Sequence, residues 1–232
     1  MSASLELLDS NLLSVRALIS LESVYADPPK ERELPTVSAL RGACTVLTVA
    51  AFEKFLRDVF EEELDHIRQA GIAASALPTK LRVEAAFASL ELAIKGDHAS
   101  KGTEREQRLN NILAVAAMLS QDSFDPKALA ATNSNPDSLC VKRMFKSVGV
   151  YEVFQKVTPK FLKLWGKPEV SGFEAQKLDG LLGSRHQVAH TAQALHISRQ
   201  ELTYNTRFVE VLAQSLQEVL AEHVTEIICS VL

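Results

Sequence analysis

Residues 40–64, LRGACTVLTVAAFEKFLRDVFEEEL, decide the fold of this chain. Apolar side chains such as Phe52 and Phe55 recur there at helical spacing, and in the middle of the segment they cover nearly the whole circumference. We predict one long helix over about 36–70, ended by Gly71. A helix that is apolar almost all round has to be covered on every side, so this one should run through the centre of a bundle.

Further helices are predicted on both sides of this segment. Most begin after a proline or at a capping box, in which a Ser or Thr oxygen and a Glu three residues later satisfy free amides of the first turn. The capping boxes start at Thr103, Ser171 and Ser198. A turn-rich loop is expected over 122–136, and short turns of helix interrupted by prolines over 150–170. The predicted helices cover residues 4–25, 78–94, 104–120, 137–147, 172–192 and 199–231.

Glycine, proline and turn signals favour an all-α protein. The chain has 9 Gly and 8 Pro in 232 residues, and it contains no Asn-Gly or Asp-Gly pair of the kind that forms tight hairpins. No stretch alternates apolar and polar residues for long enough to predict a sheet. We therefore expect an all-α helical bundle with long central helices and irregular connecting segments, folded as a single domain over residues 1–232.

Composition excludes several classes of protein. With 47% hydrophobic residues and a net charge of −4, the chain is globular rather than disordered. The three cysteines, Cys44, Cys140 and Cys229, are far apart and are interpreted as reduced, mostly buried thiols. No apolar run approaches the roughly 18 residues of a membrane span, and the N-terminal MSASLELLDSN lacks the basic start of a signal peptide. We therefore expect a cytoplasmic protein without a membrane segment.

The segment most suited to chemistry is residues 181–191, LLGSRHQVAHT. Arg185, His186, Gln187 and His190 fall within six residues of a stretch otherwise patterned for the core, where unpartnered polar groups are costly. The segment allows three interpretations: a metal site, structural histidines in a core or an interface, and a phosphate-binding site.

The metal interpretation has the least support. His186 and His190 share a helix face, but no Glu follows His186 as in a zinc-protease helix, and a third ligand would have to come from far away. We therefore expect no metal and no cofactor. The phosphate interpretation uses both residue types, because a guanidinium matches phosphate oxygens and an imidazole moves protons near neutral pH. Such groups can promote attack of an RNA 2′-hydroxyl on the adjacent phosphate, which leaves a 2′,3′-cyclic phosphate.

These residues also carry a resemblance to a known family. Arg185 and His190, with a polar residue directly after the arginine, resemble the Arg-x4–6-His signature of the HEPN superfamily. His186 stands where many members have Asn, and Thr191 replaces a common Gly. The central segment quoted above and residues 132–150, TNSNPDSLCVKRMFKSVGV, are similar to the RiboL-PSP-type branch of that superfamily.

The resemblance implies a helical bundle that pairs through its signature helices, so that both protomers line one cleft. It implies a metal-independent endoribonuclease of toxin–antitoxin, phage-defence or RNA-processing systems, with RNA, a second copy, and an antitoxin or nucleotidyltransferase as partners. Carried over, Arg185 contacts the scissile phosphate, His190 transfers protons, and His186 positions or assists. Ala192 stands where some relatives carry a Tyr that a partner modifies, so that mode of control is not expected.

Two non-catalytic alternatives stay open. One is a HEPN module that binds RNA, a nucleotide or a partner protein without cleaving it. The other is a helical interaction protein in which Arg185 and His190 only hold a dimer together. Burial of the Arg185 guanidinium against an acid of its own chain would favour the last alternative.

A basic stretch precedes the signature segment. Residues 140–170 carry seven Lys or Arg against two Glu, which is either a solvated face or a landing strip for phosphates. On the second interpretation the stretch lies near the cleft and guides RNA into it. We assign RNA binding to Lys142, Arg143 and Lys146.

Two single residues have both a structural and a functional interpretation. Glu53 lies on the long apolar helix, where it orients Arg185 or a His, or simply forms the polar edge of that helix. Trp165 either stacks a base or packs in the core.

Overall fold

The structure, a computed structural model, describes residues 2–95, 104–132 and 136–231. This part of the chain contains eight α-helices, three short 3-10 helices and no strand, which confirms the all-α prediction. The α-helices are α1 (Ala3–Glu22), α2 (Leu34–Gln69), α3 (Thr79–Lys95), α4 (Glu104–Ser120), α5 (Ser138–Ser147), α6 (Val153–Trp165), α7 (Phe173–Thr191) and α8 (Arg199–Val231). The 3-10 helices are η1 (Glu31–Glu33), η2 (Ala74–Ala76) and η3 (Pro126–Ala130).

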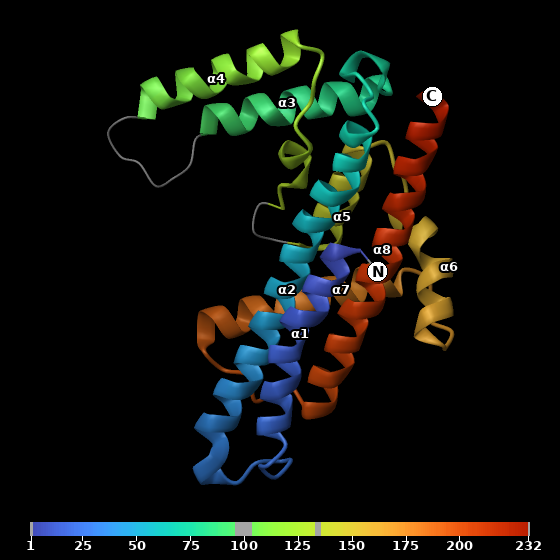
Figure 1. Ribbon diagram of the computed structural model, residues 1–232. Coiled ribbons are helices and arrows are strands. Elements are labelled where there is room, and N and C mark those ends of the chain that lie inside the picture. Colours follow the sequence, from blue (N-terminus) through green and yellow to red (C-terminus); the bar gives the residue numbers. More distant parts are fainter. Residues whose placement is uncertain (1, 96–103, 133–135, 232) are drawn as a thin grey trace.

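Helix α2 is the axis of the bundle, as the long apolar segment predicts. It packs along α1 and α8, which run beside it, and α7 lies across it (Figure 1). Phe52, Phe55 and Phe60 are fully buried, and the Phe60 ring meets the Phe145 ring of α5 edge-on, with centroids 5.1 Å apart. The helix ends shortly before Gly71, whose φ of +70° favours glycine.

The prediction of short helical turns over residues 150–170 is wrong. Helix α6 runs without a break from Val153 to Trp165, with Pro159 inside it. Pro159 is exposed, so the carbonyl that loses its helical partner lies on the solvent side. The other face of α6 is held by rings: Phe161 and Trp165 pack in an aromatic cluster with Phe173, Tyr204 and Phe208. Trp165 is 2% exposed, so its packing interpretation is confirmed.

Two of the three predicted capping boxes lie in described parts of the chain, and one of them is observed. The Ser198 hydroxyl accepts a hydrogen bond from the Glu201 amide at 3.1 Å, as predicted for the start of α8. The cap predicted at Ser171 is wrong, because Gly172, with a φ of +78°, is the N-cap of α7 and makes no side-chain capping bond. The Glu of that box, Glu174, is buried and makes no hydrogen bond to the backbone amide of Ser171. The box at Thr103 lies outside the described residues.

The loop predicted over 122–136 is more ordered than expected. Its middle forms η3, and the apolar side chains of the segment are buried against α2 and α3. The buried residues there are Phe124, Ala128, Leu129 and Ala130. The proline and turn residues of this segment predict only a connection, but its described apolar residues belong to the core.

One described helical segment, Glu31–Gln69, is long and apolar enough to cross a membrane, with a mean hydropathy of 1.4 in its best window. That segment contains the core helix α2, and 44% of the window is buried inside the protein, so its composition is weak evidence for a membrane span. The cysteines are free, with Cys44 and Cys140 buried and Cys229 exposed, which confirms the prediction of mostly buried thiols.

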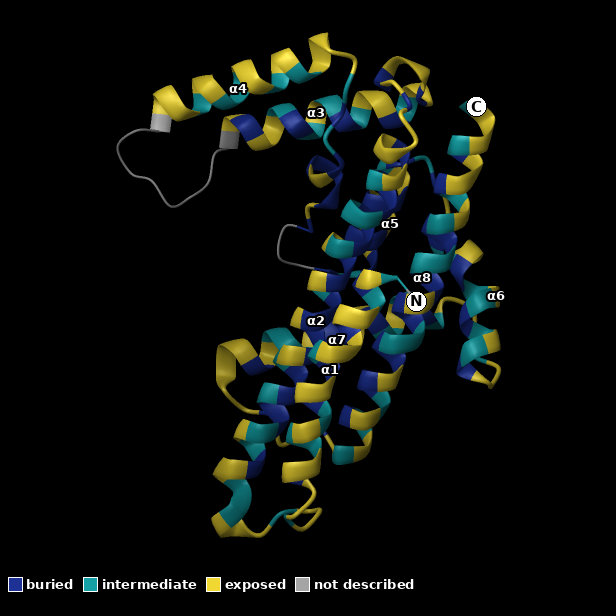
Figure 2. Ribbon diagram, in the orientation of Figure 1, coloured by how far each residue is buried: buried dark blue, intermediate teal, exposed yellow. Residues whose placement is uncertain are grey.

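Helices α3 and α4 form an antiparallel pair that projects from the rest of the bundle (Figure 1). Buried residues line the facing sides of α2, α5 and α8, whereas α4 shows none along its described length (Figure 2).

Candidate functional site

Helix α7 presents one face to the bundle and carries the predicted site residues. Leu178, Leu181, Leu182 and Val188 are its buried apolar side chains beyond the first turn. A Cβ added to Gly42 of α2 would lie 3.1 Å from Cγ1 of Val188, so the two helices approach closely at this point. The glycine is what permits α7 to cross α2 at so short a distance.

Arg185 points to the inward side of α7. On an ideal helix it lies about 40° from Leu181 and about 60° from Val188, both of which are buried. The residue is half-buried, and it makes no hydrogen bond or ion pair with any residue that the structure describes. A permanent positive charge is therefore half-buried on α7, and none of the acids that the structure describes neutralises it.

The two histidines lie on a different side of α7. His186 is half-buried and His190 is exposed, and their separation of four residues places them about 40° apart on one face. Arg185 and His190 are about 140° apart and 7.5 Å along the axis by the same geometry. The helix ends one residue beyond His190, where Ala192 takes a φ of +56°. The chain then turns back, and the Ala194 amide donates to the Ser38 hydroxyl at 3.1 Å.

Two acids hold the neighbouring segment against α2 and α7. Asp179 of α7 accepts hydrogen bonds from the Ser138 amide at 2.8 Å and from the Ser138 hydroxyl at 2.7 Å. Glu53 of α2 accepts one from the Thr132 hydroxyl at 2.9 Å. Asp179 and His186 are seven residues apart and lie within about 20° of each other on the helix. The segment similar to the RiboL-PSP-type branch is therefore bound to α2 at Thr132 and to α7 at Ser138.

Glu53 has partners other than those considered from the sequence. Its carboxylate binds Thr132 and lies 3.5 Å from Nη2 of Arg57, and the side chain is mostly buried. Its observed role is to fix the start of the segment that leads into α5. Sequence reasoning did not single out Thr132, Ser138 or Asp179. Asp137 follows Pro136 and caps α5 by accepting a hydrogen bond from the Cys140 amide at 2.7 Å. This capping pattern is the one signal in the sequence that α5 begins here, next to Ser138.

The basic stretch is divided between α5 and α6. Lys142, Arg143 and Lys146 are exposed on α5, and none of them forms an ion pair with a described acid. Lys142 lies over the Phe154 ring at 5.8 Å, and Arg143 donates to the Cys140 sulfur at 3.5 Å. Burial raises the pKa of the Cys140 thiol, with the charge of Arg143 acting in the opposite direction. The three exposed cations are one to two turns from the Ser138–Asp179 contact with α7.

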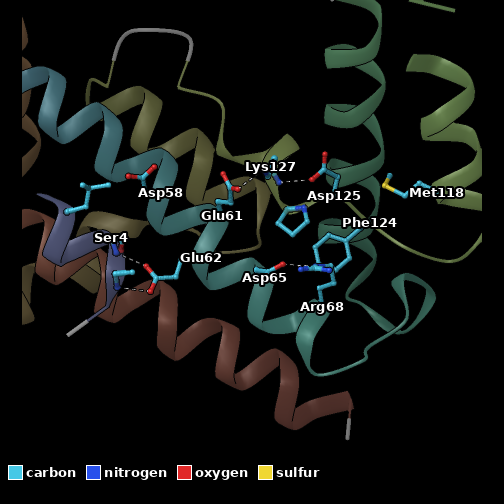
Figure 3. Close-up of a pocket in the computed structure, with 13 residues that line it drawn as sticks. Ser4, Asp58, Glu61, Glu62, Asp65, Arg68, Met118, Phe124, Asp125 and Lys127 are labelled. Atoms are coloured by element: carbon cyan, nitrogen blue, oxygen red, sulfur yellow. Dashed lines mark hydrogen bonds and ion pairs between the residues drawn. The ribbon is translucent and has the colours of Figure 1, made fainter. Parts of the chain in front are cut away.

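A large cavity lies toward the other end of α2 and does not suit an anion. It has a volume of about 800 Å³ and lies between α1, α2 and the segment around residues 118–127 (Figure 3). Asp58, Glu61, Glu62 and Asp65 line it along α2. With Asp125 the cavity has five carboxylates against the two cations Arg68 and Lys127, a balance that repels phosphates and disfavours RNA binding there.

No group of three or more His, Cys, Asp or Glu side chains suited to a metal occurs among the described residues. Among the described residues, the last three turns of α7 carry one guanidinium and two imidazoles, and the Asp179 carboxylate earlier on the helix is hydrogen-bonded to Ser138. That set can bind a phosphodiester and move protons.

The family model for RiboL-PSP-HEPN matches residues 10–222 of the chain. This chain belongs to the RiboL-PSP-HEPN family. The match runs from within α1 to within α8 and includes both similar segments and α7, so the predicted family is confirmed. Comparisons with curated proteins and with solved structures find no match.

The RiboL-PSP-HEPN assignment indicates an RNA-related module built on an all-α fold. In this member of the family, α2 supplies the core and α7 supplies the cation and the imidazoles. Arg185 and His186 are both half-buried on α7, about 100° apart around the helix, and His190 is exposed near its end.

Proposed function

We propose that this RiboL-PSP-HEPN protein is a metal-independent endoribonuclease whose site is built on α7. The observation that carries the proposal is the state of Arg185: a half-buried guanidinium without a described counter-charge, on the same two turns of helix as His186 and His190. A buried cation is unfavourable unless an anion completes it, so the site suits a phosphate supplied by the substrate.

The reaction needs no atom beyond the RNA and the protein. His190 accepts the proton of the 2′-hydroxyl, and the 2′-oxygen then forms a bond to the adjacent phosphorus. The bond from phosphorus to the 5′-oxygen breaks, and that oxygen takes up a proton. Arg185 stabilises the negative charge that develops on the phosphate oxygens, and His186 positions the substrate or the second proton. The products are a 2′,3′-cyclic phosphate and a 5′-hydroxyl.

A homodimer that pairs through α7 is part of this proposal. Arg185 and His190 of one chain lie on different sides of the helix, so a second α7 is the simplest source of the complementary group. We place the protein in the cytoplasm, in a toxin–antitoxin, phage-defence or RNA-processing system, with an antitoxin or nucleotidyltransferase as its protein partner. Lys142, Arg143 and Lys146 guide the RNA toward the cleft.

The alternative in which Arg185 and His190 only hold a dimer together has less support. That alternative expects the Arg185 guanidinium against an acid of its own chain, and the described residues provide none. A module that binds RNA without cleaving it would use the same groups. A cleavage assay distinguishes that alternative from the nuclease.

The deciding experiment uses an end-labelled oligonucleotide with a single ribose among deoxynucleotides, incubated with the protein and excess EDTA. We expect one cut, after the ribose, and a 2′,3′-cyclic phosphate end.

His190→Ala should abolish the cut and leave RNA binding largely intact, because the lost group moves a proton. His196→Ala is the matched control, since that exposed imidazole lies beyond α7 and should leave the rate unchanged. Cleavage that requires magnesium, or cuts at deoxynucleotides, would contradict the mechanism.

A further inference from the structure

A hollow of about 290 Å³ lies where α3, η3 and α5 meet. Its floor is apolar and buried, and it is formed by Ala128 and Leu129 of η3 and by Met144 of α5. Sites for drug-sized ligands are larger, roughly 300–1,000 Å³. A hollow of this size therefore suits one flat ring system rather than a helix or an extended peptide.

An exposed aromatic ring lines this hollow. Phe87 of α3 is 63% exposed, whereas every other phenylalanine of the chain is buried or half-buried. A single exposed apolar side chain is common on protein surfaces, so the groups around Phe87 have to show what would cover its ring.

The groups around Phe87 include a cation of α5. Arg143 lines the same hollow and forms no ion pair with a described acid. Lys146 follows three residues later, about 60° round the helix and about 4.5 Å along it by ideal geometry. The hollow is therefore continuous with the basic face of α5. A strand whose phosphates lie along that face can turn a base toward Phe87.

The acids of the hollow favour a base over a phosphate as its occupant. Glu84 and Glu91 line it together with Arg143, and Glu84 pairs with Lys80. Two carboxylates against one guanidinium repel a phosphate. A nucleobase is uncharged, and its edge carries both N–H donors for a carboxylate and acceptors for a guanidinium.

We propose that the hollow binds one unstacked base of a single-stranded RNA. The base lies on the Phe87 ring, and the adjoining phosphates lie on Arg143 and Lys146. Bases within a duplex are paired and stacked on one another, so the hollow selects single strands, loops and ends. The inference rests on the RNA-binding part of the proposed function and not on cleavage.

The test measures affinity for a labelled single-stranded 2′-O-methyl RNA, which lacks the attacking hydroxyl and so stays intact. Phe87→Ala should weaken binding by about 5- to 160-fold, the loss that corresponds to one base–aromatic contact. Phe87→Leu should weaken it similarly, because a leucine is apolar but offers no ring, and Phe87→Trp should retain it. Affinity for the matching duplex should be the same in all three variants. The Phe87 side chain is exposed, so circular dichroism should be unchanged.

The matched control is Val83→Ala, one turn earlier on α3, where the side chain is 41% exposed and does not line the hollow. This variant should keep the wild-type affinity. Wild-type affinity in Phe87→Ala or Phe87→Leu, or an equal loss for single strand and duplex, would overturn the inference and leave the nuclease proposal intact. Single-strand binding that depends on the Phe87 ring, in a protein that cleaves no RNA, would support the inference and contradict the nuclease. A wild type that binds no RNA would overturn both.

Discussion

Arg185 occupies a position on α7 where its neighbours in the helical repeat are apolar. Leu181 and Val188, on either side of it, are buried, and Arg185 itself has no described acid to offset its charge. An apolar side chain at this position would cost nothing in desolvation and would extend the packed face. The arginine is thus unfavourable for the fold and favourable for an anion that the isolated chain does not contain.

The first prediction is that Arg185 lowers stability but is needed for RNA binding. Arg185→Leu should leave the free energy of unfolding unchanged or raise it by about 1 kcal/mol, while RNA affinity and cleavage fall sharply. In a chain of this size, such a gain raises the melting temperature by about 2–4 °C. Arg185→Lys should restore little activity, because a lysine lacks the two-pronged geometry that fits a phosphate.

Thermal melts and RNA binding measured on the same preparations check this prediction. Arg57→Leu is a control on an exposed arginine, and it should change neither quantity much. A marked loss of stability in Arg185→Leu would instead show that the arginine is a structural residue.

At the residue scale, the local sequence reveals the candidate groups of the site but not the contacts around them. Arg185, His186 and His190 stand within one short segment, so their spacing is readable directly from the chain. Glu53 and Thr132 are separated by 79 residues, and such a contact depends on how α2 and η3 pack rather than on any local pattern. The Ser138–Asp179 contact spans 41 residues and has the same origin.

The first turn of α1 is bound to α2 by one carboxylate. Glu62 accepts hydrogen bonds from the amides of Ala3 and Ser4, both at 2.9 Å, in the first turn of α1 (Figure 3). Burial opposes ionisation, but the hydrogen bonds from Ser4 and Ala3 prevail and lower the pKa of Glu62. The ionised carboxylate therefore stabilises the fold.

The second prediction concerns the pH dependence of that contact. Because the folded-state pKa of Glu62 lies below its value in the unfolded chain, the contribution is complete above the unfolded pKa and is lost as pH falls through the folded pKa. Glu62→Gln should cost about 1–2 kcal/mol near neutral pH, and the difference from wild type should shrink in acid. Urea unfolding at a series of pH values measures it. Glu61→Gln, at a neighbouring exposed acid, should cost far less, and equal costs would contradict the assignment.

The turn that follows α7 is fixed by a buried ionic network. Nε of Arg41 donates to Glu22 at 2.8 Å, Nη1 donates to the Ile197 carbonyl at 2.9 Å, and Nη2 binds Asp27 at 3.0 Å. Glu22 is fully buried and also binds Arg199 at the start of α8. One acid therefore joins the end of α1, the start of α2 and the connection between α7 and α8.

The third prediction is that Glu22→Ala costs about 3–5 kcal/mol, because it leaves the buried Arg41 without its closest acid. Calorimetry or urea unfolding measures the loss. Asp9→Ala removes an exposed acid that pairs with Arg16 and should cost less than about 1 kcal/mol. A small cost at Glu22 would show that the network is replaceable.

At the element scale, the sequence predicted helices well and connections poorly. The long helices α2 and α8 have strong apolar periodicity over many turns, so their existence and limits follow from the chain alone. Pro159 suggested a break, but the rings of Phe161 and Trp165 stabilise α6 through tertiary packing that no local pattern reveals. Ser171 offered a cap, yet the positive φ of Gly172 starts α7 in a different geometry.

At the scale of the whole molecule, charge divides the surface. Acids of α2 line the cavity near the N-terminus, whereas cations of α5 that pair with no described acid lie one to two turns from Ser138, which binds Asp179 in the first half of α7. An RNA strand is repelled by the first region and attracted by the second. If the proposed function holds, we expect the RNA to reach α7 over α5.

The fourth prediction tests that route. Replacing Lys142, Arg143 and Lys146 by Glu should weaken RNA binding and flatten its salt dependence. Each phosphate contact with single-stranded RNA contributes a slope of about −0.7 in log affinity against log salt, so three lost contacts should change the slope by about 2. Reversal of Lys156 and Lys163 on α6 gives a comparison of the same charge type at a greater distance from Ser138. An unchanged slope in the α5 variant would show that its cations are only a solvated face.

The last prediction concerns how two chains share one reaction. Within a chain, Arg185 and His190 are about 140° apart on α7, which disfavours their acting together on one phosphate. If the active cleft combines Arg185 of one protomer with His190 of its partner, each single variant is inactive as a homodimer. A mixed dimer of Arg185→Ala and His190→Ala then retains one intact combination.

Unfolding and refolding an equal mixture of the two variants should recover about a quarter of the wild-type rate, since half the dimers are mixed and each has one complete site of two. The single-ribose substrate with EDTA measures the recovered rate, and each variant refolded alone provides the baseline. Recovery in the mixture with none in either alone requires that α7 helices of two chains meet. No recovery, with both variants folded and paired, would place Arg185 and His190 of the same chain at each site and require a bound RNA to bring them together.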